Sequence, residues 1–391
     1  MIESSKTESI GSMINYGMVG GGEGSFIGDV HRRAIGLDGM AQLVAGCFSR
    51  SAENNAITGK KLNISDERVY ADYKEMASAE AKRADGINFV SIVTPNKSHF
   101  EIAKEFLNKG INVVCDKPLT TTSAEADELT ALAREKDLLF CVTYTYTGYP
   151  AVKEARNLIK EGAIGDIRFI NAEYPQEWLA EPTGDDNKQA AWRTDPKQSG
   201  ISNCVGDIGS HIENLAYYIT GQEIETLAAR LDKIVDGRLL DDNATIMLEY
   251  KGGAKGLYWC SQIAWGSDNG LSIRIYGTTG SIEWHQEDPN YLKLVKKGSP
   301  VQILSRGRDT FSDHASSLIR LPSGHPEGYL ESFANIYKTY IAALTKKQAA
   351  ASLTADELDF PTPAMGAQGV RFIEKCVESS RKNAAWVNFQ D

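Results

Sequence analysis

Continuous apolar runs alternate with amphipathic helical patterns over roughly the first 145 residues, and this alternation limits the possible folds more than any other feature. The apolar runs predict strands at residues 14–20, 42–48, 87–93, 111–116 and 138–144. Strands that are apolar along their whole length are typical of a parallel sheet covered by helices on both faces. Helical patterns at 99–109 and 123–136 lie between them. The alternation therefore predicts an α/β domain with a doubly wound parallel sheet.

The second half of the chain has a different pattern. Alternating strands are paired across tight turns, which predicts antiparallel hairpins with turns at 251–253, 277–280 and 297–299. Amphipathic helices are expected around 151–161, 211–219, 329–346 and 366–382. These segments predict an α+β domain with a large, mainly antiparallel open sheet.

The two patterns meet near residue 146, without a flexible linker between them. We expect a loose tail at 1–12, a Rossmann domain at 13–146, and the α+β domain at 147–391. The last helix is expected to pack back on the first domain.

Composition excludes some classes of function. The chain of 391 residues has a net charge of −10 and no block of basic residues, which argues against nucleic acid or an anionic membrane surface as a partner. The six cysteines are scattered without a C-x-x-C pair, as expected for reduced thiols in a cytoplasmic protein. The start of the chain lacks a signal-peptide pattern, and no apolar run approaches the ~20 residues of a membrane span.

A glycine-rich segment directly follows the first predicted strand. It contains the candidate cofactor-binding residues Gly20, Gly22, Glu23, Gly24, Ser25 and Phe26. In a dinucleotide site the first glycine permits a tight turn, the second lets the pyrophosphate approach the backbone, and the helix N-terminus supplies N–H donors. Here Ser25 occupies the position of the third glycine. The segment predicts a site for NAD or NADP.

The end of the second predicted strand leaves the choice between these cofactors open. NAD sites usually place an acidic residue there, whereas this chain has Ser49 and Arg50. An arginine in this position can accommodate the 2′-phosphate of NADP, but it can equally be a solvent-facing loop residue.

Polar residues also follow two later strands. Thr94, Pro95 and Asn96 end the strand at 87–93, and His99 lies in the first turn of the next helix. Asp116, Lys117 and Pro118 end the strand at 111–116. Ligands of such sheets bind beyond the carboxyl ends of the strands, so these residues are candidates for the same site. His99 can equally be a packed helix residue.

Asp207 and His211 are four residues apart and share one face of a predicted helix. A carboxylate that orients an imidazole makes a general base near neutral pH. The same pair can be a surface salt bridge or half of a metal site. No third ligand with suitable spacing is present, so no metal is expected.

The order of these motifs resembles the glucose–fructose oxidoreductase/inositol dehydrogenase family (Gfo/Idh/MocA), over nearly the full length from about residue 13. The resemblance rests on the glycine-rich turn, T-P-N-x-x-H, D-K-P and D-x-x-x-H, together with the antiparallel second half. It implies that Lys117, Asp207 and His211 are catalytic, and that Asp116 and Lys117 also lie against the cofactor. The sequence departs from the usual pattern by having Asp116 where glutamate is commoner, by a longer glycine-rich segment, and by lacking the acid after the second strand.

Other polar and aromatic residues are candidates for substrate binding. Tyr144, Tyr146 and Tyr149 lie at the domain junction, Trp192 and Arg193 precede the catalytic helix, and His325 lies in a Pro/Gly-rich loop. Core or interface packing is an equally good explanation of the aromatic residues.

The resemblance implies an NAD(P)-dependent dehydrogenase that oxidises a secondary alcohol of a sugar, glycoside or cyclitol. It also implies a homodimer or homotetramer assembled through the open face of the antiparallel sheet. Two alternatives stay open: a glycosidase that oxidises its substrate transiently and recycles the cofactor, and a non-catalytic dinucleotide-binding regulator.

Overall fold

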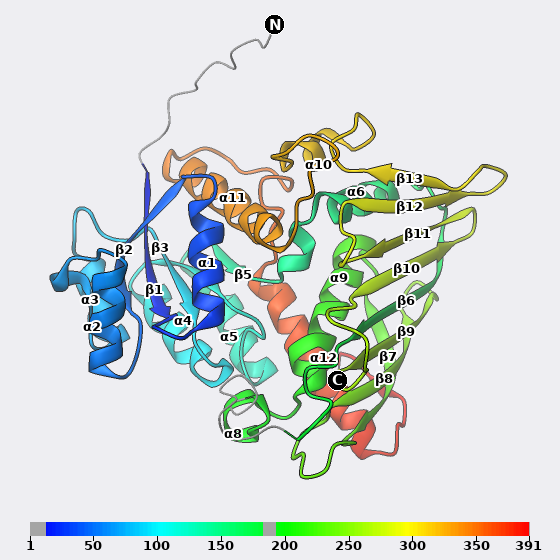
Figure 1. The fold of residues 1–391 in the computed structure, drawn as a ribbon, viewed down its shortest axis with the longest axis horizontal. Coiled ribbons are helices and arrows are strands. Elements are labelled where there is room, and N and C mark those ends of the chain that lie inside the picture. Colours follow the sequence, from blue (N-terminus) through cyan, green and yellow to red (C-terminus); the bar gives the residue numbers. More distant parts are fainter. Residues whose placement is uncertain (1–12, 183–192, 391) are drawn as a thin grey trace, which may run out of the picture.

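The computed structural model describes residues 13–182 and 193–390, which form two sheets with helices packed between and around them (Figure 1). The first sheet is parallel, with strand order β2-β1-β3-β4-β5. Its strands are β1 (Ile14–Gly20), β2 (Ala41–Cys47), β3 (Phe89–Val93), β4 (Asn112–Cys115) and β5 (Phe140–Val142). The predicted doubly wound sheet is therefore confirmed.

Helices cover both faces of this sheet, which explains why its strands are apolar throughout. Alternate residues of β1, such as Tyr16 and Met18, share a core with α1 (Phe26–Gly36) and α11 (Tyr329–Gln348). The opposite face packs on α3 (Tyr73–Glu80), α4 (His99–Asn108), α5 (Ser123–Glu135) and α12 (Pro363–Arg381). Between β2 and α3 lies α2 (Ala52–Lys61).

The second sheet is large and mainly antiparallel, as predicted, with order β13-β12-β11-β10-β6-β9-β8-β7-β14. The predicted hairpins are β8–β9, β10–β11 and β12–β13. Strand β6 pairs in parallel with β9 and antiparallel with β10, so it joins two of these hairpins. The strands are β6 (Ile167–Pro175), β7 (Ile224–Asp232), β8 (Asn243–Tyr250), β9 (Lys255–Ser261), β10 (Ser272–Gly277), β11 (Gly280–His285), β12 (Tyr291–Lys296), β13 (Gln302–Ser305) and β14 (Val387–Asn388).

One face of the second sheet carries the core of the second half. This core includes α6 (Pro150–Lys160), α9 (Ser210–Thr220), α10 (Asp313–Ser317) and part of α12. In Figure 1 these helices lie between the two sheets, and the outer face of the second sheet is not covered by any labelled element. A short α8 (Pro196–Ser199) and a π-helical turn (Val205–Gly209) lead into α9.

Both C-terminal helices return to the first sheet. The N-terminus of α5 is held against α12, because the backbone N–H and the hydroxyl of Ser123 donate to Glu374 at 2.9 and 2.5 Å. The loop before α11 is held near α1 by Arg320, whose Nε donates to Asp38 Oδ1 at 2.9 Å. Because the sheet changes between β5 and β6, we propose residue 146 as the boundary of two closely joined domains.

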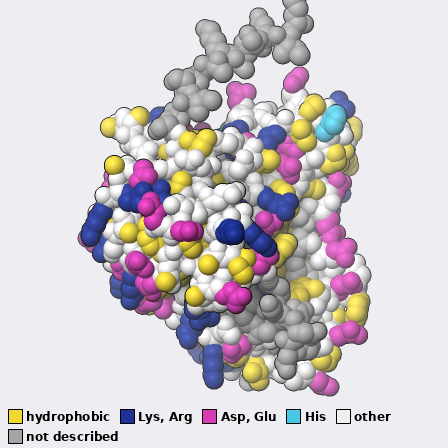
Figure 2. All heavy atoms as spheres, turned by 60° about the vertical axis from the view of Figure 1, so that its left-hand side comes forward, with side chains coloured by type: hydrophobic (Ala, Val, Ile, Leu, Met, Phe, Trp, Pro, Cys, Tyr) yellow, Lys and Arg dark blue, Asp and Glu magenta, His cyan; other side chains and the backbone are white. Residues whose placement is uncertain are grey.

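The described surface carries mixed charge. On the face drawn in Figure 2, lysine and arginine side chains are interspersed with aspartate and glutamate side chains. Within residues 13–182 and 193–390, no helix is both long and apolar enough to cross a membrane. A cytoplasmic location stays a prediction.

Candidate active site

The glycine-rich segment forms a tight turn between β1 and α1. Gly20 and Gly21 have φ of 88° and 74°, a left-handed conformation that favours glycine. Ser25 caps α1, since its hydroxyl accepts a hydrogen bond from the Gly28 N–H at 3.3 Å. A Cβ on Gly28 would lie 2.3 Å from Gly21 Cα. Gly28 is therefore the small residue that close packing between the turn and α1 requires. The prediction that Ser25 takes this role was wrong.

This loop is fixed from the side of α2. The backbone N–H of Glu23 donates to Asn54 Oδ1 and Thr58 Oγ1, both at 3.0 Å. A Cβ on Gly22 would lie 2.4 Å from Asn54 Oδ1. The chain thus presents bare backbone next to the N-terminus of α1, which fits the pyrophosphate of a dinucleotide. Asn54 and Thr58 were missed because nothing in the sequence connects them with the glycine-rich segment.

Ser49 and Arg50 lie at the carboxyl end of β2, where the adenosine ribose of a dinucleotide would bind. Arg50 is exposed, and the hydroxyl of Ser49 accepts a hydrogen bond from the Ser51 N–H at 3.1 Å. Ser51 in turn caps α2. This geometry is compatible with either cofactor.

Replacing Gly28 with alanine is expected to weaken NAD binding about 5- to 100-fold, because the added methyl group must displace the backbone of Gly21. Titration of the protein's fluorescence with NADH measures the change. Gly36→Ala is the matched control, since Gly36 ends the same helix and a Cβ there meets no atom within 4 Å. Equal affinity in both variants would contradict the assignment of Gly28 to the cofactor loop.

A cavity of about 680 Å³ lies between the two halves of the molecule. Its first wall comes from the ends of β3 and β4 and from the start of α1, and includes Ser25, Phe26, Thr94, Pro95, Asn96, Asp116 and Lys117. Its second wall comes from β6, from the segment before α9 and from loops of the second sheet, and includes Tyr146, Tyr174, Arg193, Asp207 and His211. The structure therefore brings the predicted catalytic residues together in one cavity.

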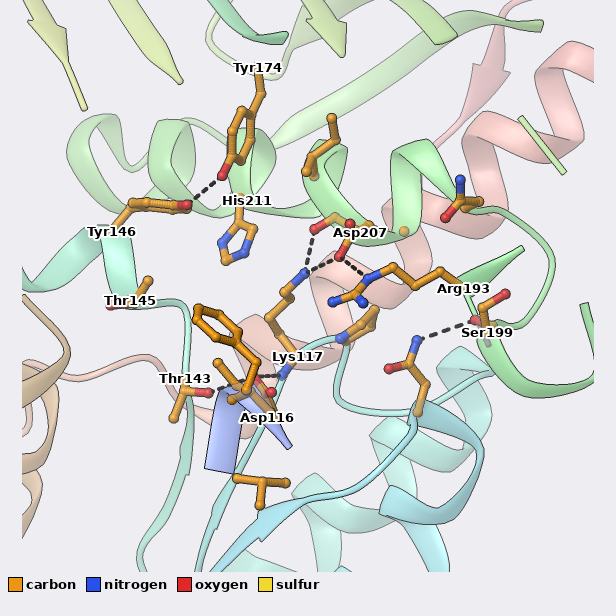
Figure 3. A pocket seen from close by; sticks show the side chains of 18 of the residues that line it. Asp116, Lys117, Thr143, Thr145, Tyr146, Tyr174, Arg193, Ser199, Asp207 and His211 are labelled. Carbon is orange, nitrogen blue, oxygen red and sulfur yellow. Dashed lines mark hydrogen bonds and ion pairs between the residues drawn. The ribbon is translucent and has the colours of Figure 1, made fainter. Parts of the chain in front are cut away.

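Lys117 reaches across this cavity from the first domain to Asp207 (Figure 3). Its Nζ donates to Asp207 Oδ1 at 3.1 Å and also to the backbone oxygen of Asp207. The backbone of Lys117 is held by Asp116, whose Oδ1 accepts from the Lys117 N–H at 2.9 Å and from the Thr143 hydroxyl at 3.0 Å. The lysine that ends β4 therefore points at the second half of the cavity.

Asp207 lies in the π-helical turn and is surrounded by donors. Besides Lys117, its carboxylate accepts a hydrogen bond from Gln262 Nε2 at 3.0 Å, and Arg193 Nε lies 3.4 Å from Oδ1. Burial alone would raise the pKa of Asp207, but the charges of Lys117 and Arg193 outweigh burial and hold the pKa below its ordinary range. Asp207 is therefore a carboxylate that fixes the position of Lys117.

His211 follows one turn later, at the start of α9. Its ring packs edge-to-face against Tyr146, with centroids 4.7 Å apart. Burial, followed by the charge of Lys117, lowers the pKa of His211 well below its ordinary value of 6.5, and Asp207 opposes this only in part. Among the described residues, no hydrogen bond joins Asp207 to the imidazole of His211, although the sequence predicts that Asp207 orients it. The carboxylate of Asp207 instead accepts hydrogen bonds from Lys117 and Gln262. The neighbouring rings orient His211 instead.

Several candidate residues lie away from the cavity. His99 is fully buried, and its Nδ1 and Nε2 lie 2.9 and 2.7 Å from the backbone oxygens of Pro118 and Thr94. It ties the loops after β3 and β4 together, and its assignment to direct cofactor contact is corrected accordingly.

Only some of the aromatic candidates for substrate binding line the main cavity. Tyr146 lines the cavity, whereas Tyr144 is a buried core residue behind His211, with ring centroids 5.6 Å apart. Tyr149 and His325 line a neighbouring cavity instead. Tyr144 therefore does not reach the main cavity, and its assignment to direct substrate contact is corrected. Tyr149 and His325 stay predictions for substrate contact, at the neighbouring cavity. Trp192 lies outside the described residues.

A network of amides and tyrosines lines the cavity opposite the cofactor loop, and sequence reasoning missed it. Asn269 Oδ1 accepts from the Tyr174 hydroxyl at 2.6 Å and from Gln176 Nε2 at 2.8 Å. Asn269 Nδ2 donates to Gln286 Oε1 at 3.0 Å. Trp178 donates to Gln176 at 2.9 Å and also packs against Arg193. Tyr174, Gln176 and Trp178 come from the end of β6 and the residues after it, whereas Asn269 precedes β10 and Gln286 follows β11. No local motif therefore predicts the network.

A parallel Rossmann sheet with a glycine-rich first turn, joined to a cavity lined by a lysine, a carboxylate and a buried histidine, is typical of an NAD-binding oxidoreductase. Residues 14–144 match the oxidoreductase family with an NAD-binding Rossmann fold, and residues 152–283 match the GFO/IDH/MocA C-terminal domain. The chain belongs to the Gfo/Idh/MocA family of oxidoreductases.

Relatives match over almost the whole chain. An uncharacterized oxidoreductase of Bacillus subtilis (strain 168) is 38% identical, over 97% of this chain and 98% of that protein. The crystal structure of an inositol dehydrogenase homolog from Azotobacter vinelandii, complexed with NAD+, is 36% identical, with a TM-score of 0.94 over 99% of this chain and 100% of that one. A crystal structure of an inositol dehydrogenase homolog from the same organism, complexed with NADH and myo-inositol, is 34% identical, with a TM-score of 0.90 over 97% and 98% of the two chains.

Proposed function

We propose that the protein is an NAD(P)-dependent dehydrogenase that oxidises a secondary alcohol of a cyclitol, sugar or glycoside. The observation that carries this proposal is the position of Lys117, held by Asp207 beside a buried histidine, at the carboxyl ends of the Rossmann strands. The relative described with NADH and myo-inositol supports the substrate class.

The nicotinamide supplies a hydride acceptor for the carbinol carbon when the cofactor is bound. Lys117 donates a hydrogen bond to the reacting oxygen, which gains negative charge as its proton leaves. Asp207 keeps the ammonium group in place through two contacts, one from its carboxylate and one from its backbone oxygen. The pair therefore stabilises the alkoxide character of the transition state.

His211 accepts the proton of the same hydroxyl. Because its pKa lies well below 6.5, the imidazole is neutral at pH 7 and can act as a base. The rings of Tyr146 and Tyr174 surround it, with centroids 4.7 and 6.2 Å away, and limit the access of water. His211 and Lys117 thus act on one oxygen from two sides of the cavity.

The walls of the cavity favour a neutral polyol. Its basic side chains Lys117 and Arg193 are both directed at the carboxylate of Asp207, which balances their charge. The amides of Gln176, Asn269 and Gln286 offer donors and acceptors that match vicinal hydroxyl groups. Among the described lining residues, a phosphorylated or strongly acidic substrate finds no comparable excess of positive charge.

We also propose a homodimer or homotetramer formed through the outer face of the second sheet. Phe169 and Tyr276 are direct cross-strand partners on that face, with exposed fractions of 38% and 42%, and Met247 of β8 is also exposed. Sedimentation velocity measures the assembly state.

Absorbance of the reduced nicotinamide tests the proposed function, after the protein is mixed with NAD or NADP and a panel of cyclitols, aldoses and glycosides. The expected result is a sustained rise with at least one pairing. Release of an aglycone without net reduction of the cofactor would identify the recycling glycosidase. Cofactor binding without any turnover would favour the regulator.

A further inference from the structure

A second cavity, of about 1000 Å³, lies at one end of the antiparallel sheet. Asn269 precedes β10, Gln286 follows β11, Asn290 precedes β12, and Arg306 follows β13. Because neighbouring antiparallel strands run in opposite directions, these four loop positions meet at the same end of the sheet. They surround the second cavity together with the loop before α11.

The second cavity adjoins the candidate active site. Asn269, Gln286 and Tyr329 line both cavities. The side chain of Asn269 bonds the Tyr174 hydroxyl on the side of the first cavity, and that of Gln286 bonds the Tyr149 hydroxyl, at 3.3 Å, on the side of the second. A ligand that places one ring beside Lys117 can therefore extend past these amides into the second cavity.

The lining of the second cavity suits a polyhydroxylated group. Tyr291 has an exposed fraction of 44% and offers an aromatic face for a sugar ring. Asp268 and Asp288 offer carboxylate acceptors. Glu327 is buried, and its Oε2 has no hydrogen-bond partner among the described residues. Arg306 is also buried, and it forms an ion pair with Glu327 at 3.2 Å. Because the charge of Arg306 is balanced by Glu327, the charges of Asp268 and Asp288 give the cavity lining an excess of negative charge.

We propose that the second cavity binds the second sugar unit of a glycoside whose first ring is oxidised beside Lys117. This inference rests on the proposed function and names its substrate more closely: a neutral or cationic glycoside of a sugar or cyclitol. A phosphate or uronic acid on the second unit is excluded by the carboxylates.

Paired substrates test the proposal: galactinol against myo-inositol, and maltose and cellobiose against glucose. The expected result is a kcat/KM at least about tenfold higher for one glycoside than for its parent. Tyr291→Ala is expected to reduce the ratio of the two kcat/KM values about five- to tenfold. The kcat/KM of the parent sugar or cyclitol is expected to stay unchanged. The matched control is Trp386→Ala, which removes another exposed aromatic side chain, directly before β14 and outside the lining of both cavities.

Calorimetric titration of the NADH-loaded protein gives a readout that needs no turnover. Tighter binding of the glycoside, lost in Tyr291→Ala and kept in Trp386→Ala, supports the second subsite. Oxidation of parents and glycosides at equal rates, with Tyr291→Ala unchanged, would overturn this inference and leave the proposed function standing. Absence of turnover across the panel overturns the proposed function, and equal calorimetric affinities in that case overturn the subsite as well.

Discussion

Replacing Lys117 with methionine is expected to lower kcat by at least about 100-fold and to leave NADH affinity almost unchanged. Methionine keeps much of the length of the side chain but removes the ammonium group that meets Asp207 at 3.1 Å. The lost interaction belongs to the transition state, when the substrate oxygen becomes negative, so the effect falls on kcat more than on binding. Steady-state kinetics and NADH titration measure both quantities.

Lys160→Met is the matched control for this variant, because Lys160 is exposed at the end of α6 and does not line the cavity. It is expected to keep the wild-type kcat. Parallel loss of NADH binding and activity in Lys117→Met would show that Lys117 holds the cofactor and does not stabilise the reacting oxygen.

Replacing His211 with asparagine is expected to lower kcat by about 100- to 10,000-fold, the range for removal of a general base. Asparagine retains a polar group but cannot accept the substrate proton at neutral pH. The control His285→Asn changes a histidine at the end of β11, outside the cavity lining, and is expected to be silent. A His211→Asn enzyme with more than about a tenth of wild-type kcat would assign the proton to another group.

The pH profile of kcat gives an independent check on the same residue. Activity requires neutral His211, so it falls as the pH drops through the pKa of the imidazole. Because burial and then the charge of Lys117 lower this pKa, the acid limb is expected well below pH 6.5. In Lys117→Met one of these causes is removed, so the acid limb of the remaining activity is expected to move to higher pH. An unchanged limb would contradict the electrostatic link between the two residues.

The sequence predicts those parts of the fold that depend on local patterns. The parallel strands are apolar on both faces, and the hairpins have tight glycine-containing turns, so both are visible in a single chain. The position of β6 between β9 and β10 is not, because pairing between distant strands leaves no local signal. The two-residue strand β14 is too short for any pattern.

The candidate site shows the same division. Lys117, Asp207 and His211 follow strand ends or a helix start, where polar residues interrupt apolar runs. Asn269 and Gln286 look like ordinary loop residues, and only the meeting of several strand ends brings them to the cavity. His99 and Tyr144 are residue types that often occur in binding sites, but both side chains are buried here. The direction of a side chain in or next to a loop is not visible in a sequence.

Transfer of deuterium from the substrate to the cofactor tests the central claim most directly. Wild-type protein is incubated with NAD, or with NADP if the panel selects it, and with the oxidised substrate deuterated at its carbinol carbon. Mass spectrometry then locates the label. The proposed mechanism predicts deuterium in the reduced nicotinamide, in an amount equal to the ketone formed. Label that stays in the product or passes to water, with no labelled reduced cofactor, would contradict it.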